Sequence, residues 1–202
     1  RVVHVMDREA DSYELFDQLV GLGTNFVVRL SHDRRLANDE GQGEEDEISI
    51  TEARERTAVR LTRRGELSRR GASAKPKQRA THPARDEREA NLEIASCKVK
   101  VRRPHHDQKC APELELNVVQ VREPNAPEGQ PAVEWRLVTN RPIDTREQVA
   151  AVVDHYRARW QIEEYFKAIK TGCGFCKRQA TSLDALVRVL ALLIPTAWRL
   201  LA

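Results

Sequence analysis

The first 31 residues, RVVHVMDREADSYELFDQLVGLGTNFVVRLS (1–31), decide the class of fold. The β-branched run at 1–6 ends at Asp7 and is typical of a strand buried within a sheet. Residues 11–23 follow with leucines at helical spacing, and 25–31 form a second apolar run. A strand, a helix and a strand at this spacing predict an α/β core.

Residues 32–130 have a different character. The segment DEGQGEEDE (39–47) holds six acids and no base, whereas 54–88 holds twelve Lys or Arg against four Asp or Glu. Residues 92–102 and 114–123 alternate apolar and polar side chains, which predicts antiparallel strands exposed on one face. We therefore expect a β-rich insertion at 32–130 that interrupts the α/β core.

Residues 131–202 are expected to form the second part of the core that 1–31 begins. The run at 133–143 predicts a strand, and 145–171 and 182–201 predict helices. The candidate N-caps of the three expected helices are Asp11, Thr145 and Ser182.

The composition is that of a globular chain, with 40% hydrophobic and 32% charged residues among 202 and a net charge of +3. The basic stretch favours a polyanion partner, because clustered Lys and Arg gain from releasing phosphate counterions. Composition alone slightly favours a solvated, partly disordered loop instead. The four scattered cysteines do not fit a secreted disulfide framework, and the uncharged run 189–198 is too short for a membrane helix. We expect a cytoplasmic protein with no membrane partner.

A zinc site is a weaker interpretation of the cysteines. Cys173 and Cys176 form a C-x-x-C, and Cys97, Cys110 and two histidines lie upstream. The spacing of the upstream pair is too long for a zinc motif, and the glycines around the C-x-x-C favour a simple turn.

The helix expected at 145–171 contains DHYRARWQIEEYFKAIKT (154–171), and four of its polar side chains are predicted to share one side: Tyr156, Arg159, Glu163 and Lys170. At ~100° per residue they fall within a stripe about 60° wide and ~21 Å long. Arg159–Glu163 and Glu163–Lys167 are also i,i+4 pairs, which are normal on an exposed helix. However, the stripe borders an apolar stripe that would hold the helix against the sheet: Ile162, Phe166 and Ile169. An acid between cations at such a border suits phosphate chemistry.

A phosphoryl-transfer site needs at least two carboxylates to hold Mg²⁺. Asp7 is the best second candidate after Glu163, because it ends an apolar strand and open α/β sheets bind ligands beyond the carboxyl ends of their strands. A turn or an N-cap before the first helix is an equally common role for such an Asp.

These residues resemble the DDE transposases of the insertion-sequence-four type. The resemblance rests on DREAD (7–11), FVVRLS (26–31), VEWRLVTNRP (133–142) and the spacing Y-x-x-R-x-x-x-E-x-x-x-x-x-x-K, which begins at Tyr156. It runs over about residues 1–200 and is weakest at 32–115, within the insertion.

The resemblance implies an RNase H-like catalytic core, partial in this chain, with the β-rich insertion between its second Asp and its Glu. It implies that Asp7 and Glu163 are catalytic and bind Mg²⁺ or Mn²⁺ for phosphodiester cleavage and strand transfer. The residues that it implies contact double-stranded DNA at the transposon ends are Tyr156, Arg159, Lys170, Trp135, Trp160 and Arg29. Trp135 would receive a flipped base, although a core position is as common for a strand Trp, and Trp160 has the same two interpretations.

The chain starts at Arg1 within a strand-like run and stops within a helical pattern, so we expect a fragment. The family's first catalytic Asp would precede Arg1, and this chain alone is expected to be inactive, whereas the intact protein is expected to form a homodimer. A catalytically inactive DNA-binding remnant of a transposase is the alternative. A helical scaffold with salt bridges along its stripe is a remoter one.

Overall fold

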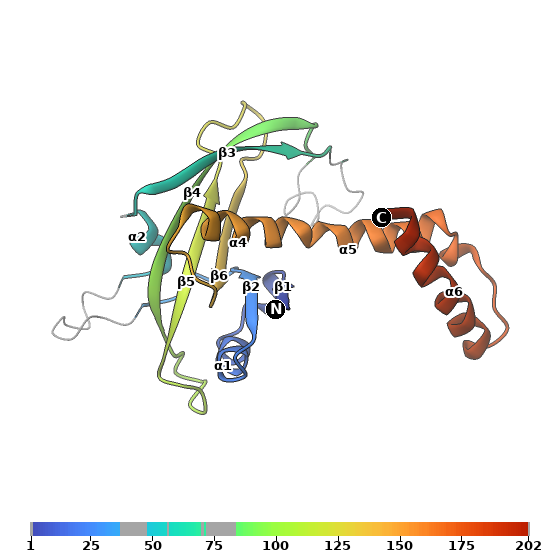
Figure 1. Cartoon of the computed structure of the whole chain (residues 1–202), viewed down its shortest axis with the longest axis horizontal. Helices are drawn as coiled ribbons and strands as arrows, with labels where there is room; N and C mark the ends of the chain where they lie inside the picture. Colours follow the sequence, from blue (N-terminus) through green and yellow to red (C-terminus); the bar gives the residue numbers. More distant parts are fainter. Residues whose placement is uncertain (1, 37–47, 56, 70, 72–83, 202) are drawn as a thin grey trace. The chain divides into compact units, whose positions relative to one another are not determined.

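The computed structural model describes residues 2–36, 48–55, 57–69, 71 and 84–201 (Figure 1). The chain divides into two compact units, Arg1–His155 and Tyr156–Ala202. The first unit contains the sheet, and the second is helical. The acidic segment 39–47 and residues 72–83 of the basic stretch lie outside the described residues.

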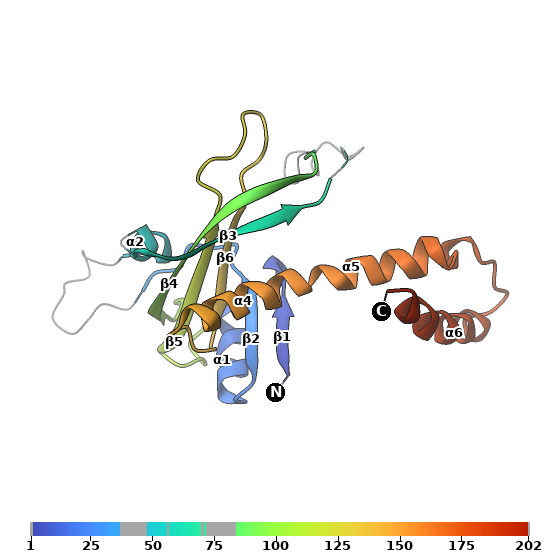
Figure 2. The same ribbon diagram turned by 45° about the horizontal axis from the view of Figure 1, so that its top comes forward.

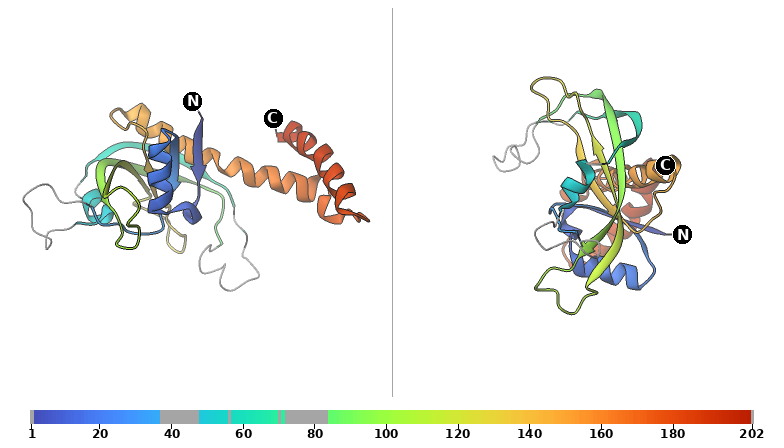
Figure 3. Two further views of the ribbon diagram at one scale, coloured as in Figure 1. Left: turned by 90° about the horizontal axis from the view of Figure 1, so that it is seen from below. Right: turned by 90° about the vertical axis from the view of Figure 1, so that its left-hand side faces the viewer.

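Within the described residues, the first unit is built on one mixed sheet of six strands. In chain order these are β1 (Val3–Met6), β2 (Asn25–Arg29), β3 (Val59–Leu67), β4 (Arg88–Arg102), β5 (Glu113–Arg122) and β6 (Glu134–Thr139). Their order across the sheet is β1-β2-β6-β5-β4-β3. Strands β1 and β2 are parallel, and all other neighbours are antiparallel. The sheet is curled, as the two views of Figure 3 show, and the predicted α/β class is confirmed.

The first face of the sheet carries helices α1 (Tyr13–Gly21) and α2 (Ile50–Glu55). Helix α1 connects the parallel strands β1 and β2, as Figure 2 shows. The ring of Phe16 in α1 stacks on that of Phe26 in β2 with centroids 5.7 Å apart. The Tyr13 hydroxyl donates to the Ala111 carbonyl at 2.9 Å, and burial raises the pKa of Tyr13 to about 12. This face therefore contains a continuous apolar core.

The second face carries helix α4 (Arg146–Ala158), whose residues Val149, Val152 and Val153 are fully buried. Lys98 of β4 pairs with Asp144 at 2.7 Å, and Arg63 of β3 pairs with Asp154 at 2.6 Å. Because this face is also covered, the centres of β4 and β5 are buried on both sides. The prediction that these strands expose one face is thus right only near their ends.

Several boundaries differ from the sequence prediction. Strand β3 and helix α2 were not expected, and β4 begins four residues before the predicted start at 92. Strand β6 ends at Thr139 rather than at 143. At the next position the Asn140 side chain, and not the backbone, makes the hydrogen bonds to the β2 segment: its Oδ1 accepts from Phe26 N and its Nδ2 donates to Thr24 O. Asp11 does not cap α1, since Ser12 occupies the N-cap position.

The predicted N-cap of α4 is confirmed. Thr145 Oγ1 accepts from Gln148 N at 3.3 Å, while Gln148 Oε1 accepts from the backbone N–H groups of Asp144 and Thr145. This reciprocal arrangement is a capping box, which satisfies backbone donors that the helix itself leaves unpaired.

The helix predicted at 145–171 is not continuous. Helix α4 ends at Ala158, α5 spans Trp160–Lys167, and a π-helical turn, η3, spans Ala168–Gly172. Around Arg159 the backbone makes tight i→i−3 bonds, from Arg159 N to Tyr156 O and from Ile162 N to Arg159 O. Arg159, between the two helices, keeps helical dihedral angles.

In the second unit, α5 packs on α6 (Leu183–Leu201). The Tyr165 hydroxyl donates to Ile194 O at 3.1 Å. The rings of Tyr165 and Trp198 make an edge-to-face contact with their centroids 6.1 Å apart. Ser182 accepts from Ala185 N, as predicted for the start of this helix. No helix among the described residues is long and apolar enough to cross a membrane.

Candidate active site

Asp7 lies directly after β1, at the carboxyl end of the strand. The pair Met6–Val28 ends the β1–β2 register, and Met6 packs into the core on the first face. Because side chains alternate along an extended strand, Asp7 points to the second face, with Val5 and Val27. Its Oδ1 also accepts from Arg8 N at 2.9 Å and caps the short helix η1 (Arg8–Ala10). The capping role that the sequence left open is therefore real, but a carboxylate has about four acceptor positions, so capping does not prevent metal binding.

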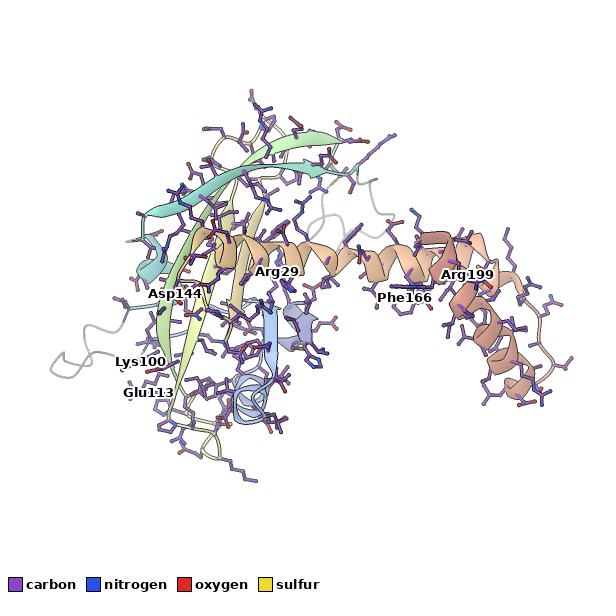
Figure 4. All side chains as sticks on the ribbon, in the orientation of Figure 1. Arg29, Lys100, Glu113, Asp144, Phe166 and Arg199 are labelled. Carbon is purple, nitrogen blue, oxygen red and sulfur yellow. The ribbon has the colours of Figure 1, made fainter. Side chains whose placement is uncertain are left out.

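Arg29 and Trp135 lie on the same face and at the same end of the sheet as Asp7. Arg29 follows Val28 and pairs with Leu137 of β6, and Trp135 comes two residues before Leu137. The Arg29 Nη2 donates to the backbone oxygen of Glu134 at 3.1 Å, which ties the two strands together at this end. Figure 4 labels Arg29 beside β2. Three of the predicted site residues are thus brought together within the first unit.

The second unit, which begins at Tyr156 near the end of α4, carries the remaining predicted residues. Tyr156 is only 7% exposed, and the Arg159 guanidinium lies 6.0 Å from the centroid of its ring. Arg159 Nη1 also approaches Glu163 Oε1 at 3.4 Å. Arg159 is therefore held between an aromatic face and a carboxylate, and Tyr156, Arg159 and Glu163 form the contiguous group that the sequence predicted.

Lys170 contacts a different residue, Phe166. It lies in the π-helical turn η3, where each residue turns through a smaller angle than in an α-helix. Its Nζ lies 5.7 Å from the centroid of the Phe166 ring. Lys167 pairs with Glu164 at 3.4 Å rather than with Glu163, so one of the two expected i,i+4 pairs does not form.

The apolar stripe expected beside the polar one is only partly buried. Ile169 is buried, but Ile162 and Phe166 are about half exposed, and Tyr165 makes the ring contact with α6. Trp160 is 51% exposed and so is not a core residue of this unit. An exposed, rigid aromatic plane is the type of surface on which a nucleic-acid base stacks.

The chemistry of the predicted carboxylates suits a hard divalent cation, because Mg²⁺ and Mn²⁺ bind one or two protein carboxylates together with substrate phosphate oxygens. The Glu163 side chain is half exposed and accessible to such a ligand set. Among the described residues, no three His, Cys, Asp or Glu side chains cluster as a metal site, and all four cysteines are free thiols.

Sequence reasoning missed the role of Asp11, whose side chain is fully buried. Its carboxylate accepts from Ser31 N at 2.6 Å, from His32 N at 2.8 Å and from the Arg34 guanidinium. Burial alone would raise the pKa of Asp11, but the hydrogen bonds from Arg34, His32 and Ser31 outweigh it and lower the pKa. Asp11 thereby fixes the path of the chain that leaves β2. The DREAD segment contains this residue, but nothing in its spacing distinguishes a buried anchor from a cap.

Asp7, at the carboxyl end of a strand in an α/β sheet, lies where such sheets bind their ligands. Comparison with known protein families defines the class. Residues 2–197 match the family described as the transposase DDE domain, and the chain belongs to this family. The substrate of this class is DNA.

Proposed function

We propose that the protein is a DDE transposase of the insertion-sequence-four type that cleaves phosphodiester bonds at transposon ends and transfers the strand in cut-and-paste transposition. The observation that carries this proposal is the family match over residues 2–197, which includes both Asp7 and the Y-R-E-K spacing from Tyr156 to Lys170. The proposed architecture is an RNase H-like core formed by 1–31 and 131–202 with an insertion at 32–130. The mixed order of the sheet, with one parallel pair followed by antiparallel strands, supports it.

In this proposal, Asp7 and Glu163 are the catalytic carboxylates and hold Mg²⁺ or Mn²⁺. When bound, the ion supplies charge neutralisation at the scissile phosphate and lowers the pKa of the attacking water or hydroxyl group. Asp7 is suited to this role because the sheet holds its backbone rigidly at the carboxyl end of β1.

The cationic residues are proposed to bind the phosphates beside the cut. Arg159 is preorganised by Tyr156 and Glu163, so little side-chain entropy remains to be lost when it binds an oxygen. Lys170 lies one π-turn further along and would bind a neighbouring phosphate as a flexible point charge. Arg29, on β2, would bind another phosphate of the DNA backbone.

The two tryptophans are proposed to contact bases. Trp135 stands on the face of the sheet that carries Asp7, where a stacked base is worth roughly 1–3 kcal/mol. Trp160 offers its half-exposed indole on the helix. The intact protein is proposed to act as a homodimer on two transposon ends.

The test is cleavage of end-sequence DNA by the protein expressed from its complete gene, with Asp7→Asn and Glu163→Gln as variants. Each should reduce metal-dependent cleavage by at least about 10³-fold, since each removes a metal ligand. Glu164→Gln is the matched control: it lies on the same helix, one residue away, and pairs with Lys167. It should retain cleavage within a few-fold.

DNA binding without metal should be unchanged or slightly tighter in the two carboxylate variants, because removing negative charge reduces repulsion from phosphate. Cleavage that survives in Glu163→Gln, or that is lost equally in Glu164→Gln, would falsify the assignment of Glu163.

A further inference from the structure

Three aromatic residues gather in the second unit where α5 meets α6: Tyr165, Phe166 and Trp198. The rings of Tyr165 and Phe166 have centroids 5.9 Å apart, and those of Tyr165 and Trp198 are 6.1 Å apart. Phe166 is 46% exposed and Trp198 is 64% exposed. A contiguous exposed patch of large apolar side chains, unlike a single such residue, marks a binding surface. None of the three belongs to the candidate active site, and we call them the aromatic cluster.

Contacts between α5 and α6 hold the aromatic cluster in place. The Tyr165 hydroxyl donates to Ile194 O, which ties the two helices together. The planes of the Tyr165 and Trp198 rings are inclined by 74°, so this contact orients the indole and leaves much of it exposed. Ala197, next to Trp198, is fully buried and fixes the backbone of α6 at this point. Because the indole is already oriented, little side-chain entropy is lost when a planar group stacks on it.

Positive charge accompanies the aromatic cluster. The Nζ of Lys170 lies 5.7 Å from the centroid of the Phe166 ring. The segment 165–183, from the end of α5 to the start of α6, holds four Lys or Arg and no Asp or Glu. Lys167 pairs with Glu164. The other three form no ion pair within the part of the chain that the structure describes: Lys170, Lys177 and Arg178.

The charge of the whole second unit has the same sign. Residues 156–202 hold eight Lys or Arg and three Asp or Glu. Each acid already pairs with a different cation: Glu163 with Arg159, Glu164 with Lys167 and Asp184 with Arg188. The cations that remain in excess include Arg199, which follows Trp198 and is labelled together with Phe166 in Figure 4. Such an excess favours a partner that carries phosphates over an apolar one.

Aromatic rings beside cations are the combination that binds single-stranded nucleic acid, because bases stack on the rings while the cations bind the phosphates. A base can stack on a side chain only when it has left the stack of a duplex. Helix α6 also exposes two aliphatic residues that a second copy of the chain could cover, Leu183 and Val187. They lie about three helical turns or more before Trp198 and are therefore not part of the aromatic cluster.

We propose that the aromatic cluster binds unpaired DNA, with a base stacked on the Trp198 indole and the phosphates of the strand bound by Arg199 and the cations of 165–183. The inference rests on the proposed function in that it takes DNA as the ligand. It adds a site for single-stranded DNA to the proposed contacts with the transposon ends. A duplex frays beside a broken strand, so an enzyme that cleaves phosphodiester bonds meets such unpaired segments.

The test compares Trp198→Leu, which keeps an apolar side chain but loses the aromatic face, with Trp198→Phe, which keeps an aromatic face. Binding of a fluorescein-labelled single strand of about 12 bases is measured by anisotropy over a salt series, with the protein expressed from its complete gene and with EDTA present to prevent cleavage. Trp198→Leu should lose roughly tenfold in affinity, as expected for one stacked base. It should keep the slope of log K against log salt, because no charge is removed. Trp198→Phe should stay within about threefold of the wild type.

Leu192→Ala is the matched control, because Leu192 is 72% exposed on another side of α6. It should bind the strand as the wild type does. A strand of the same length with abasic sites in place of its bases carries the phosphates alone, so the wild type and Trp198→Leu should bind it equally. Equal losses in Trp198→Leu and Trp198→Phe, an unchanged affinity in Trp198→Leu, or a gap that persists on the abasic strand would each overturn the inference.

The other occupant, a second copy of the chain, is tested by light scattering on the DNA-free protein. We expect the same mass for the wild type and for Trp198→Leu. A wild-type dimer that becomes a monomer in Trp198→Leu would assign the aromatic cluster to an interface between two copies, and the inference would be wrong.

A last measurement needs no variant. A strand that contains iododeoxyuridine crosslinks on irradiation to an aromatic side chain stacked on that base, and mass spectrometry locates the crosslink. We expect it at Trp198 or Phe166, and crosslinks confined to other residues would contradict the inference. Failure of the proposed function is distinguishable: if Glu163→Gln cleaves normally while the crosslink forms at Trp198, only the catalytic assignment is wrong.

Discussion

At the scale of single residues, Asp11 shows how one carboxylate can anchor a loop. Replacing it with Ala leaves Arg34 beneath the surface without its partner, and breaking a buried pair costs about 3–5 kcal/mol. We expect Asp11→Ala to lower the free energy of unfolding by about 3 kcal/mol in urea denaturation. Asp184→Ala, which removes an exposed pair with Arg188, should cost less than ~1 kcal/mol. Similar losses in the two variants would contradict the anchoring role.

The pH dependence of stability follows from the same residue. The pKa of Asp11 is lowered in the folded protein. Its contribution to the free energy of unfolding is therefore fully present above the pKa of Asp in the unfolded chain, about 4, and is lost as the pH falls through the folded-state pKa. Wild-type stability should therefore drop more steeply below about pH 4 than that of Asp11→Ala. Thermal unfolding at a series of pH values measures this, and parallel curves would exclude Asp11 as the source.

Lys170 and Lys167 offer a matched comparison on the helix. Lys167 pairs with Glu164, whereas Lys170 lies over the Phe166 ring and is predicted to bind DNA. Lys170→Ala should reduce the slope of log K against log salt by about one, as expected for the loss of one phosphate contact. Lys167→Ala should change it little. If both variants behave alike in the anisotropy assay, the assignment of Lys170 fails.

At the scale of elements, the capping box fixes the start of α4, the helix that contains Tyr156. Thr145→Ala removes the side-chain acceptor for Gln148 N and should lower the free energy of unfolding by about 1 kcal/mol. Thr145→Ser retains the oxygen and should cost only a few tenths of that. Equal destabilisation by Ser and Ala would mean that the methyl group, and not the cap, is responsible.

At the scale of the whole molecule, the two units differ in how much they bury. In Tyr156–Leu201 only Tyr156, Ile169 and Ala197 are buried, whereas strands β4 and β5 alone contain many fully buried residues. Local opening costs little where few apolar contacts are lost. We expect the amides of α6 to exchange with solvent at least about 100-fold faster than those of β4 and β5 in the DNA-free protein. Uniform protection, measured by hydrogen exchange and mass spectrometry, would contradict this difference.

The sequence by itself determined the local elements whose periodicity is strong. The β1–α1–β2 unit, the alternating strands β4 and β5 and the placing of Tyr156, Arg159 and Glu163 on one side of a helix follow from the periodicity of the sequence. The cap at Thr145 follows from its hydroxyl group and from Gln148 three residues later. These patterns depend on neighbours only a few positions away, so a single sequence displays them directly.

Only the tertiary structure decided how these elements combine. Strand β6 pairs with β2, and β3 forms from a segment whose composition is that of a basic loop. Asp11 is buried under Arg34, and a pocket forms between 32–35 and 102–105. Each of these features joins residues far apart in the chain. The π-turn that displaces Lys170 likewise has no periodic signal. Pairing and register are set by which faces are buried together, and that choice depends on the whole sheet rather than on any one segment.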